Sequence, residues 1–271
     1  MIELLQYDFM KYALIAGIFA SIACGIIGTY IVSKRIVFLS GGISHAAFGG
    51  IGLGYFLGIS PLLGAVGFSI VFALLLGTAS MKMKQREDTT IGVMWSFGMA
   101  LGILFIYLTP GYAPDLMSYL FGSILTVSAF EILLILGLDA IIITVVALLY
   151  KEFFAICFDE EFAKVRGVPV EKIYLILLCL IALSVVILIR IVGVILVIAM
   201  LSIPAAISGK YTHNLKNIMF LSCFLGAVFM ILGLGLSYAF DLPSGATIIL
   251  VSVLGFLIGN IDTKYYRKLK I

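Results

Sequence analysis

The stretch SGGISHAAFGGIGLGYFLG, from Ser40 to Gly58, decides how this chain folds. On a helix, every fourth residue of the stretch is small, in the series Gly42, Ala46, Gly50, Gly54 and Gly58. Such overlapping small-xxx-small motifs let two helix backbones approach closely within a membrane. A glycine in a helix interior costs on the order of 1 kcal/mol relative to alanine, so we expect this stripe to pack against other helices.

The first histidine of the chain lies beside this stripe. His45 is about 100° around the helix from its small neighbours, on a line with Gly41 and Gly49. An ionisable side chain inside a membrane span is a candidate for function, because a charge buried there costs at least a few kcal/mol. His45 is therefore either a transient metal contact on a transport path or a histidine that is hydrogen-bonded between helices.

The composition of the whole chain requires a membrane. Of its 271 residues, 63% are hydrophobic and 11% are charged, and the mean hydropathy is +1.25. A soluble domain of this size could not bury so much apolar surface, so the lipid bilayer is its solvent. The net charge is only +3, which argues against nucleic acid as a partner. The four cysteines have no CxxC spacing, and we interpret them as packing residues.

The apolar runs predict an all-helical, polytopic bundle of about nine transmembrane spans in a single domain, residues 1–271. Arg190 divides the sixth run from the seventh, and a continuous element there would reduce the count to eight. The predicted spans are 12–32, 41–58, 62–79, 91–108, 130–149, 173–189, 191–207, 218–240 and 246–258.

Basic residues predict which loops lie in the cytoplasm. Lys and Arg gather in the loops at 80–90 and 150–172 and in the tail at 264–270. The positive-inside rule places these segments, and so the C-terminus, on the cytoplasmic side of the cell membrane. With nine spans, the N-terminus would then lie outside.

A short charged helix is predicted within the polar stretch 150–172. Asp159 opens this helix, and Gly167 ends it just before Pro169. Acidic residues occupy its first turn and basic residues its last, which suits the helix dipole. The helix is either a solvated connector or a docking element for a cytoplasmic partner.

Five segments of the chain, in order, resemble the membrane permease subunits of ABC-type importers for zinc, manganese and related metals. Many members of that family have an Asp one turn before the histidine, where this chain has Gly41. Only His45 therefore matches this pair of metal ligands. The five segments are KRIVFLSGGISHAAFGG (34–50), YLFGSILTVS (119–128), FDEEFAKVRGVPVE (158–171), RIVGVILVIAMLSIPAAIS (190–208) and LSYAFDLPSGATIIL (236–250).

The resemblance implies a permease core made of two copies of this chain, with a divalent metal ion as substrate and no permanently bound cofactor. A separate extracellular or periplasmic binding protein would deliver the ion, with zinc expected ahead of manganese or iron. The chain has no GxxxxGK[ST] motif, so ATP would be hydrolysed by a cytoplasmic ATPase subunit and not by this chain. That subunit would dock on the coupling helix at about 158–168, through Asp159, Glu160, Glu161, Ala163, Arg166 and Gly167.

Two further residues are candidates for the metal path. Asp139 lies in the middle of an apolar span and would face a water-filled interior or pair with a basic residue. Met200 precedes Pro204 by one turn, and the missing N–H of the proline frees a carbonyl near it. Met200 therefore either lines a pore or fills a core.

Two other functions are compatible with parts of this pattern. A proton- or sodium-coupled carrier would need buried carboxylates paired across inverted repeats, and only Asp139 is of this kind. An ABC permease for a metal chelate would share every feature of the metal permease except the substrate.

Overall fold

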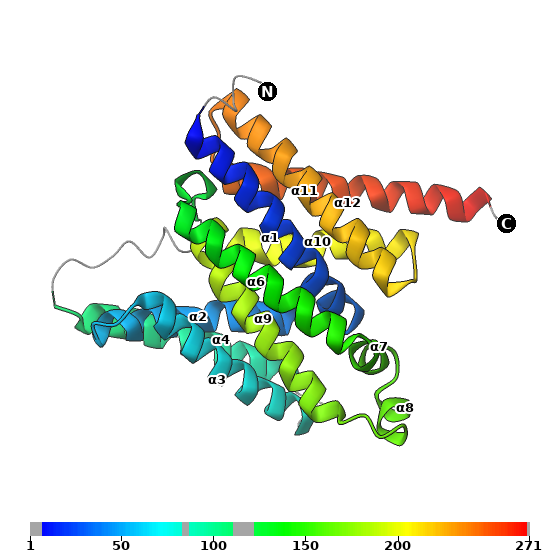
Figure 1. Ribbon diagram of the computed structural model, residues 1–271, viewed down its shortest axis with the longest axis horizontal. Helices are drawn as coiled ribbons and strands as arrows, with labels where there is room; N and C mark the ends of the chain where they lie inside the picture. The colour runs from blue at the N-terminus through cyan, green and yellow to red at the C-terminus, as the bar shows by residue number, and fades with distance from the viewer. Residues whose placement is uncertain (1–6, 83–86, 111–121, 270–271) are drawn as a thin grey trace.

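The computed structural model describes residues 7–82, 87–110 and 122–269 of the chain, and these ranges are helical without any strand. The predicted all-helical class is therefore confirmed. The elements, labelled as in Figure 1, are α1 (Asp8–Ser33), α2 (Val37–Phe56), α3 (Pro61–Lys82), α4 (Glu87–Leu108), the 3₁₀ turn η2 (Ile124–Thr126), α6 (Ala129–Leu148), α7 (Tyr150–Phe158), α8 (Glu160–Val165), α9 (Val170–Val192), α10 (Val194–Tyr211), α11 (Leu215–Phe240) and α12 (Ser244–Leu269).

Nine helices in the described ranges are long and apolar enough to cross a membrane, namely α1 to α4, α6 and α9 to α12. The predicted count of about nine spans is confirmed. The predicted division of 173–207 into two helices is confirmed, but α9 continues through Arg190 and ends at Val192. The break is at Gly193, whose φ of +82° is a conformation that side-chain-bearing residues rarely adopt.

Local sequence explains several helix ends. Pro61 begins α3, where its missing N–H removes no helical hydrogen bond. Ser128 and Glu131 form a capping box at the start of α6, which satisfies two backbone donors at once. The basic loop at 80–90 lies partly outside the described residues, as does the segment that begins at Tyr119.

The helices form two groups (Figure 1). In one group, α2 packs against α3 and α4. In the other, α1 packs against α6, α10 and α11, and α12 packs against α10 and α11. Helix α9 contacts α3 and α2 on one side and α6, α10 and α1 on the other, so it connects the two groups.

The small residues of α2 pack within this one chain, against two different helices. Gly42 and Ala46 face α4, where a Cβ on Gly42 would lie 2.9 Å from Cγ2 of Ile91. Gly50 faces α3, where its Cβ would lie 2.5 Å from the carbonyl oxygen of Gly64. Gly54 also faces α3, at the first residue of that helix. Gly58, which we expected on this stripe, instead follows the end of α2 with a φ of +68° and open space at its Cβ position.

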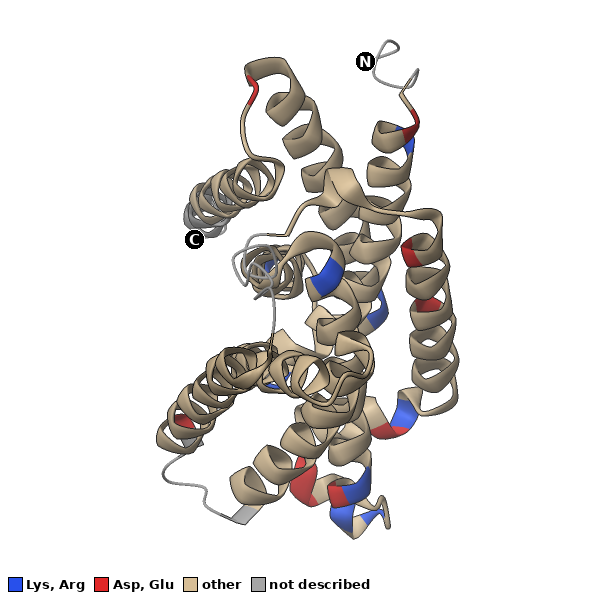
Figure 2. Cartoon of the chain, turned by 90° about the vertical axis from the view of Figure 1, so that its left-hand side faces the viewer, with Lys and Arg blue, Asp and Glu red and all other residues tan. Residues whose placement is uncertain are grey.

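Charged side chains are sparse along the helices (Figure 2). Several of them gather at the end of the bundle that carries α8. This end holds the ion pair between Lys34 and Glu160, and the opposite end holds the pair between Arg190 and Glu131. The long apolar faces between the two ends are those expected to meet lipid.

Candidate functional site

Helix α2 is almost completely enclosed by its neighbours. From Leu39 to Gly52, every residue is buried except His45, which is half-buried. Its imidazole stacks on Trp95 of α4, with ring centroids 3.9 Å apart and an interplanar angle of 14°. The Nδ1 atom of His45 is buried and has no hydrogen-bond partner in the described part of the chain. His45 therefore occupies the one half-buried position in this part of α2 and has a buried ring nitrogen without a hydrogen-bond partner.

The surroundings of His45 explain why glycines flank it on α2. A Cβ on Gly41 would lie 3.8 Å from Cζ3 of Trp95, so the indole covers the turn before the histidine. A Cβ on Gly49 would lie 2.8 Å from Cε1 of Phe68, so α3 closes the turn after it. The cleared groove predicted from the sequence is therefore occupied by aromatic rings from the two neighbouring helices.

Asp139 lies in a different interface. It is on the buried face of α6, which packs against α1 and α9, and only 5% of it is exposed. Neither carboxylate oxygen has a hydrogen-bond partner within the described residues, so the basic partner considered above is not seen there. An ionised carboxylate without a partner is costly in such surroundings.

Met200 lies where three helices meet. The residue is 1% exposed on α10, and its Cε would be 3.3 Å from a Cβ on Gly226 of α11. Ser21 of α1 lies beside the same position. Pro204 sits within α10, as predicted, and leaves a carbonyl one turn earlier without its helical donor. In this conformation Met200 fills a packed core.

The three candidates thus lie in three different interfaces. Among the residues that the structure describes, no three His, Cys, Asp or Glu side chains converge on a point that could hold a metal ion. Of the three, His45 is the one with both partial exposure and an unpartnered ligand atom. A transport path requires weak ligation, since a closed set of strong ligands would trap the ion.

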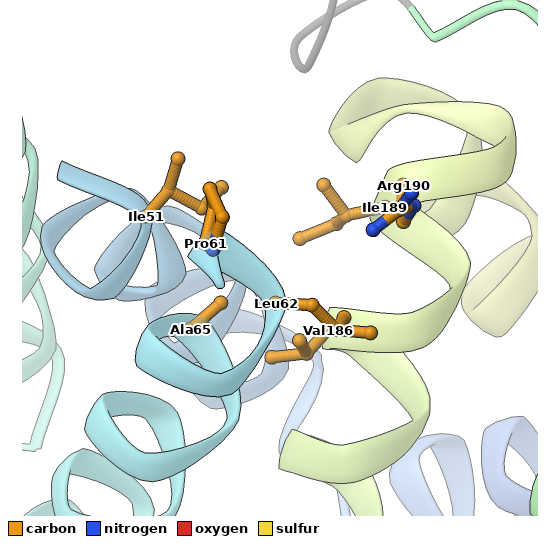
Figure 3. Close-up of a pocket in the computed structure, with 7 residues that line it drawn as sticks. All are labelled: Ile51, Pro61, Leu62, Ala65, Val186, Ile189 and Arg190. Carbon is orange, nitrogen blue, oxygen red and sulfur yellow. The ribbon is translucent and has the colours of Figure 1, made fainter. Parts of the chain in front are cut away.

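A small cavity separates α9 from α2 and α3 (Figure 3). It encloses about 20 Å³ and is apolar except for Arg190. The Nε atom of Arg190 donates a 2.8 Å hydrogen bond to Glu131, the capping residue of α6. This pair joins the end of α9 to the start of α6. The lining residues are Ile51, Pro61, Leu62, Ala65, Val186, Ile189 and Arg190.

The predicted short helix at 159–167 is present as α8. Asp159 is its N-cap and accepts a 2.9 Å hydrogen bond from the amide of Phe162, and Gly167 follows it with a φ of +80°. Ala163 is buried, so it faces this chain's own body, whereas Phe162 and Val165 are exposed, Val165 at 87%. An exposed apolar face on a short helix is typical of a surface that binds another protein.

Lys34 holds α8 against the bundle. Its ammonium group pairs with the carboxylate of Glu160 and donates a 3.0 Å hydrogen bond to the carbonyl of Ile156 in α7. The same group lies 5.0 Å from the ring centroid of Tyr174 in α9. The Lys34 side chain is only 6% exposed. One cation at the end of α1 therefore contacts α7, α8 and α9.

Replacing Lys34 with methionine should loosen α8. The change removes a charged donor from a sheltered site, which costs on the order of 1.5 kcal/mol and corresponds to about tenfold faster local opening. Hydrogen exchange across residues 159–168 measures this. Lys11→Met is the matched control, because Lys11 lies in the same helix in an exposed pair with Asp8. Equal exchange in both variants would show that Lys34 does not hold α8.

Two residues, one beside His45 and one beside α8, were not identified as important from the sequence. Trp95 is the single tryptophan of the chain, but nothing in its spacing indicates a partner 50 residues earlier. Lys34 follows the first span, where a basic residue is normally explained by the membrane surface alone. Both roles depend on contacts between distant segments.

The comparisons with known proteins agree over nearly the whole chain. The sequence matches the ABC 3 transport family over residues 6–262. A protein of Synechocystis sp., described as an uncharacterized membrane protein, is 54% identical over 95% of this chain and 92% of its own. The manganese transport system membrane protein MntC of Listeria monocytogenes is 36% identical over 94% of this chain and 91% of its own. The structure of PsaBC from Streptococcus pneumoniae in complex with Fab has a TM-score of 0.87 and 33% identity and covers 100% of both chains.

Proposed function

Because this chain belongs to the ABC 3 transport family and is the membrane permease subunit of a metal importer, we propose that its substrate is Mn²⁺ and that the ion passes His45. The observation that supports the path is the half-buried imidazole with its unpartnered Nδ1. Membership of this family sets aside the proton- or sodium-coupled carrier considered above.

The choice of manganese over zinc rests on two considerations. Relatives such as the Listeria protein are named manganese transporters, and a site with one protein ligand leaves the ion most of its water, which Mn²⁺ accepts. Zinc is the second candidate, because a lone imidazole is the one ligand offered here and it suits zinc well.

The partners follow from the same proposal. We place the α8 end of the bundle and the C-terminus in the cytoplasm, where a separate ATPase subunit binds α8 and hydrolyses ATP. Asp159, Glu160, Glu161, Arg166 and Gly167 shape this helix and its charged rim, and buried Ala163 seats it on the bundle. A second copy of the chain completes the permease, and a binding protein outside the cell delivers the ion.

Uptake into vesicles tests the substrate. The permease is reconstituted with its ATPase, the binding protein is added, and ATP-dependent accumulation of Mn²⁺ and Zn²⁺ is measured separately and in competition. The proposal is supported if Mn²⁺ accumulates faster than Zn²⁺ and if added Zn²⁺ does not suppress Mn²⁺ uptake. If Zn²⁺ is taken up in preference, the substrate is zinc and the proposal of manganese is wrong. If neither free ion accumulates, the substrate is a metal chelate.

Val165→Asp should remove the ATPase from the purified complex. Val165 is 87% exposed, so the substitution removes no contact within the chain. It places a charge in the apolar face that α8 shares with Phe162, and a desolvated unpaired charge costs several kcal/mol at an interface. Copurification of the ATPase measures the effect, with Val165→Ile as the control that preserves the apolar surface. If both variants retain the ATPase equally, α8 is not its docking element.

A further inference from the structure

The indole of Trp95 covers the candidate ligand His45. The two rings are stacked in parallel at 3.9 Å, and the indole also reaches the turn at Gly41. The other residues of α2 between Leu39 and Gly52 are buried by their neighbours. Trp95 therefore stands over the one partly open position in that part of α2.

Stacking on Trp95 gives the His45 ring a neighbour but gives its Nδ1 atom no hydrogen-bond partner. Buried ring nitrogens in proteins nearly always have a hydrogen-bond partner, yet Nδ1 of His45 has none among the described residues. A histidine with a purely structural role would be expected to use this nitrogen. A buried ring nitrogen without a partner, beneath a stacked indole, is what we expect of a metal ligand that is covered in this conformation.

Helix α4, which carries Trp95, also has a glycine on the side toward which the indole could move. Side chains on a helix lean toward its N-terminus, so the residue three positions earlier lies under Trp95. That residue is Gly92, and no atom of the described residues lies within 4 Å of its Cβ position. The side of Trp95 that faces Gly92 is therefore the one toward which the indole has room to rotate.

We propose that Trp95 is a movable cover that controls access to His45. In the conformation described here the cover is closed, and rotation of the indole over Gly92 exposes Nδ1 to a divalent cation. Trp95 is thus a positioning residue for the metal contact, and this inference rests on the proposed function of His45.

The two histidines of the chain allow a direct test that needs no transport. The permease–ATPase complex is treated with diethylpyrocarbonate, which modifies accessible imidazoles, and the rates at His45 and His213 are followed by mass spectrometry. His213 is exposed and serves as the internal reference. We expect His45 to react about tenfold more slowly than His213, the factor that a stacked aromatic pair can supply.

Three variants separate a cover from simple burial. Trp95→Ala should bring the rate at His45 close to that of His213, whereas Gly92→Val, which fills the space for rotation, should slow it further. Phe97→Ala is the matched control, because it removes an exposed ring from the same helix. If His45 reacts as fast as His213 in the wild type, or if Trp95→Ala and Gly92→Val both leave its rate unchanged, the cover does not exist.

Fluorescence connects the cover to the ion, because Trp95 is the only tryptophan of the chain. The permease is reconstituted with an ATPase and a binding protein in which tryptophan is replaced by phenylalanine, so the emission comes from Trp95. Addition of Mn²⁺ should change this emission in the wild type and leave it unchanged in His45→Gln. An unchanged wild-type emission in vesicles that import Mn²⁺ would overturn the cover. Vesicles that import no metal would instead overturn the proposed function, while the modification rates still decide the cover.

Discussion

Gly64→Ala is expected to destabilise the permease by about 1–3 kcal/mol, the usual cost of forcing extra volume into a packed core. Gly64 lies where α3 crosses α2, and a Cβ there would lie 3.0 Å from Cα of Gly54 and even closer to the carbonyl oxygen of Gly50. Both contacts are with backbone, so no side chain can move aside. The two helices must separate, although alanine is the better helix former by on the order of 1 kcal/mol.

Gly67→Ala on the same helix is the matched control. No described residue lies within 4 Å of its Cβ position, so only the gain in helix propensity remains and stability should be unchanged or slightly higher. Thermal unfolding in detergent measures both variants, followed by a thiol-reactive dye in a background where Cys24 is the buried cysteine and the three partly exposed ones are replaced by serine. Equal melting temperatures would mean that the close contact of α2 and α3 does not stabilise the fold.

His45→Ala is expected to reduce metal uptake by at least about tenfold, the loss typical of groups that support a metal ligand even from outside its coordination shell. The side chain contacts the indole of Trp95, and its removal adds no volume to α2. Assembly should therefore survive while the proposed contact with the ion is lost. ATP-dependent uptake into vesicles with equal amounts of complex measures the effect.

His213→Ala provides the comparison for the second histidine, which lies outside the spans between α10 and α11. This variant should transport at the wild-type rate. Uptake that is unchanged in both variants would exclude His45 from the path and direct attention to Asp139 and Met200. Loss of the ATPase from the His45→Ala complex would show a structural effect instead.

The fold could be predicted from the sequence to the level of individual spans. Long apolar runs separated by charged or proline-containing loops determine where membrane helices lie, and nine such helices are present in the described residues. The division between α9 and α10 was predicted at Arg190 and not at Gly193, because charge was taken as the end of a helix. The Arg190 side chain instead reaches Glu131, and the break lies at Gly193, whose φ is +82°.

The site could be predicted less completely. Periodicity identified the small face of α2 and the position of His45, because both follow from one helix. It could not show that Gly42 and Gly50 face different helices, or that Trp95 stacks on His45, since these depend on how distant segments pack. Asp139 and Met200 were grouped with His45 by chemistry, and the structure places each in a separate interface.

Because a single residue, Gly193, links α9 to α10, we expect a tilt of α9 to move α10 as well. Helix α9 begins just after α8 and has 23 residues, so it is about 34 Å long. A tilt of about 10° at the α8 end would carry the far end by about 6 Å. Because only Gly193 separates it from α10, that displacement passes to α10 with almost no slack. A small rotation at the α8 end of α9 would thereby become a displacement of several ångströms at the start of α10.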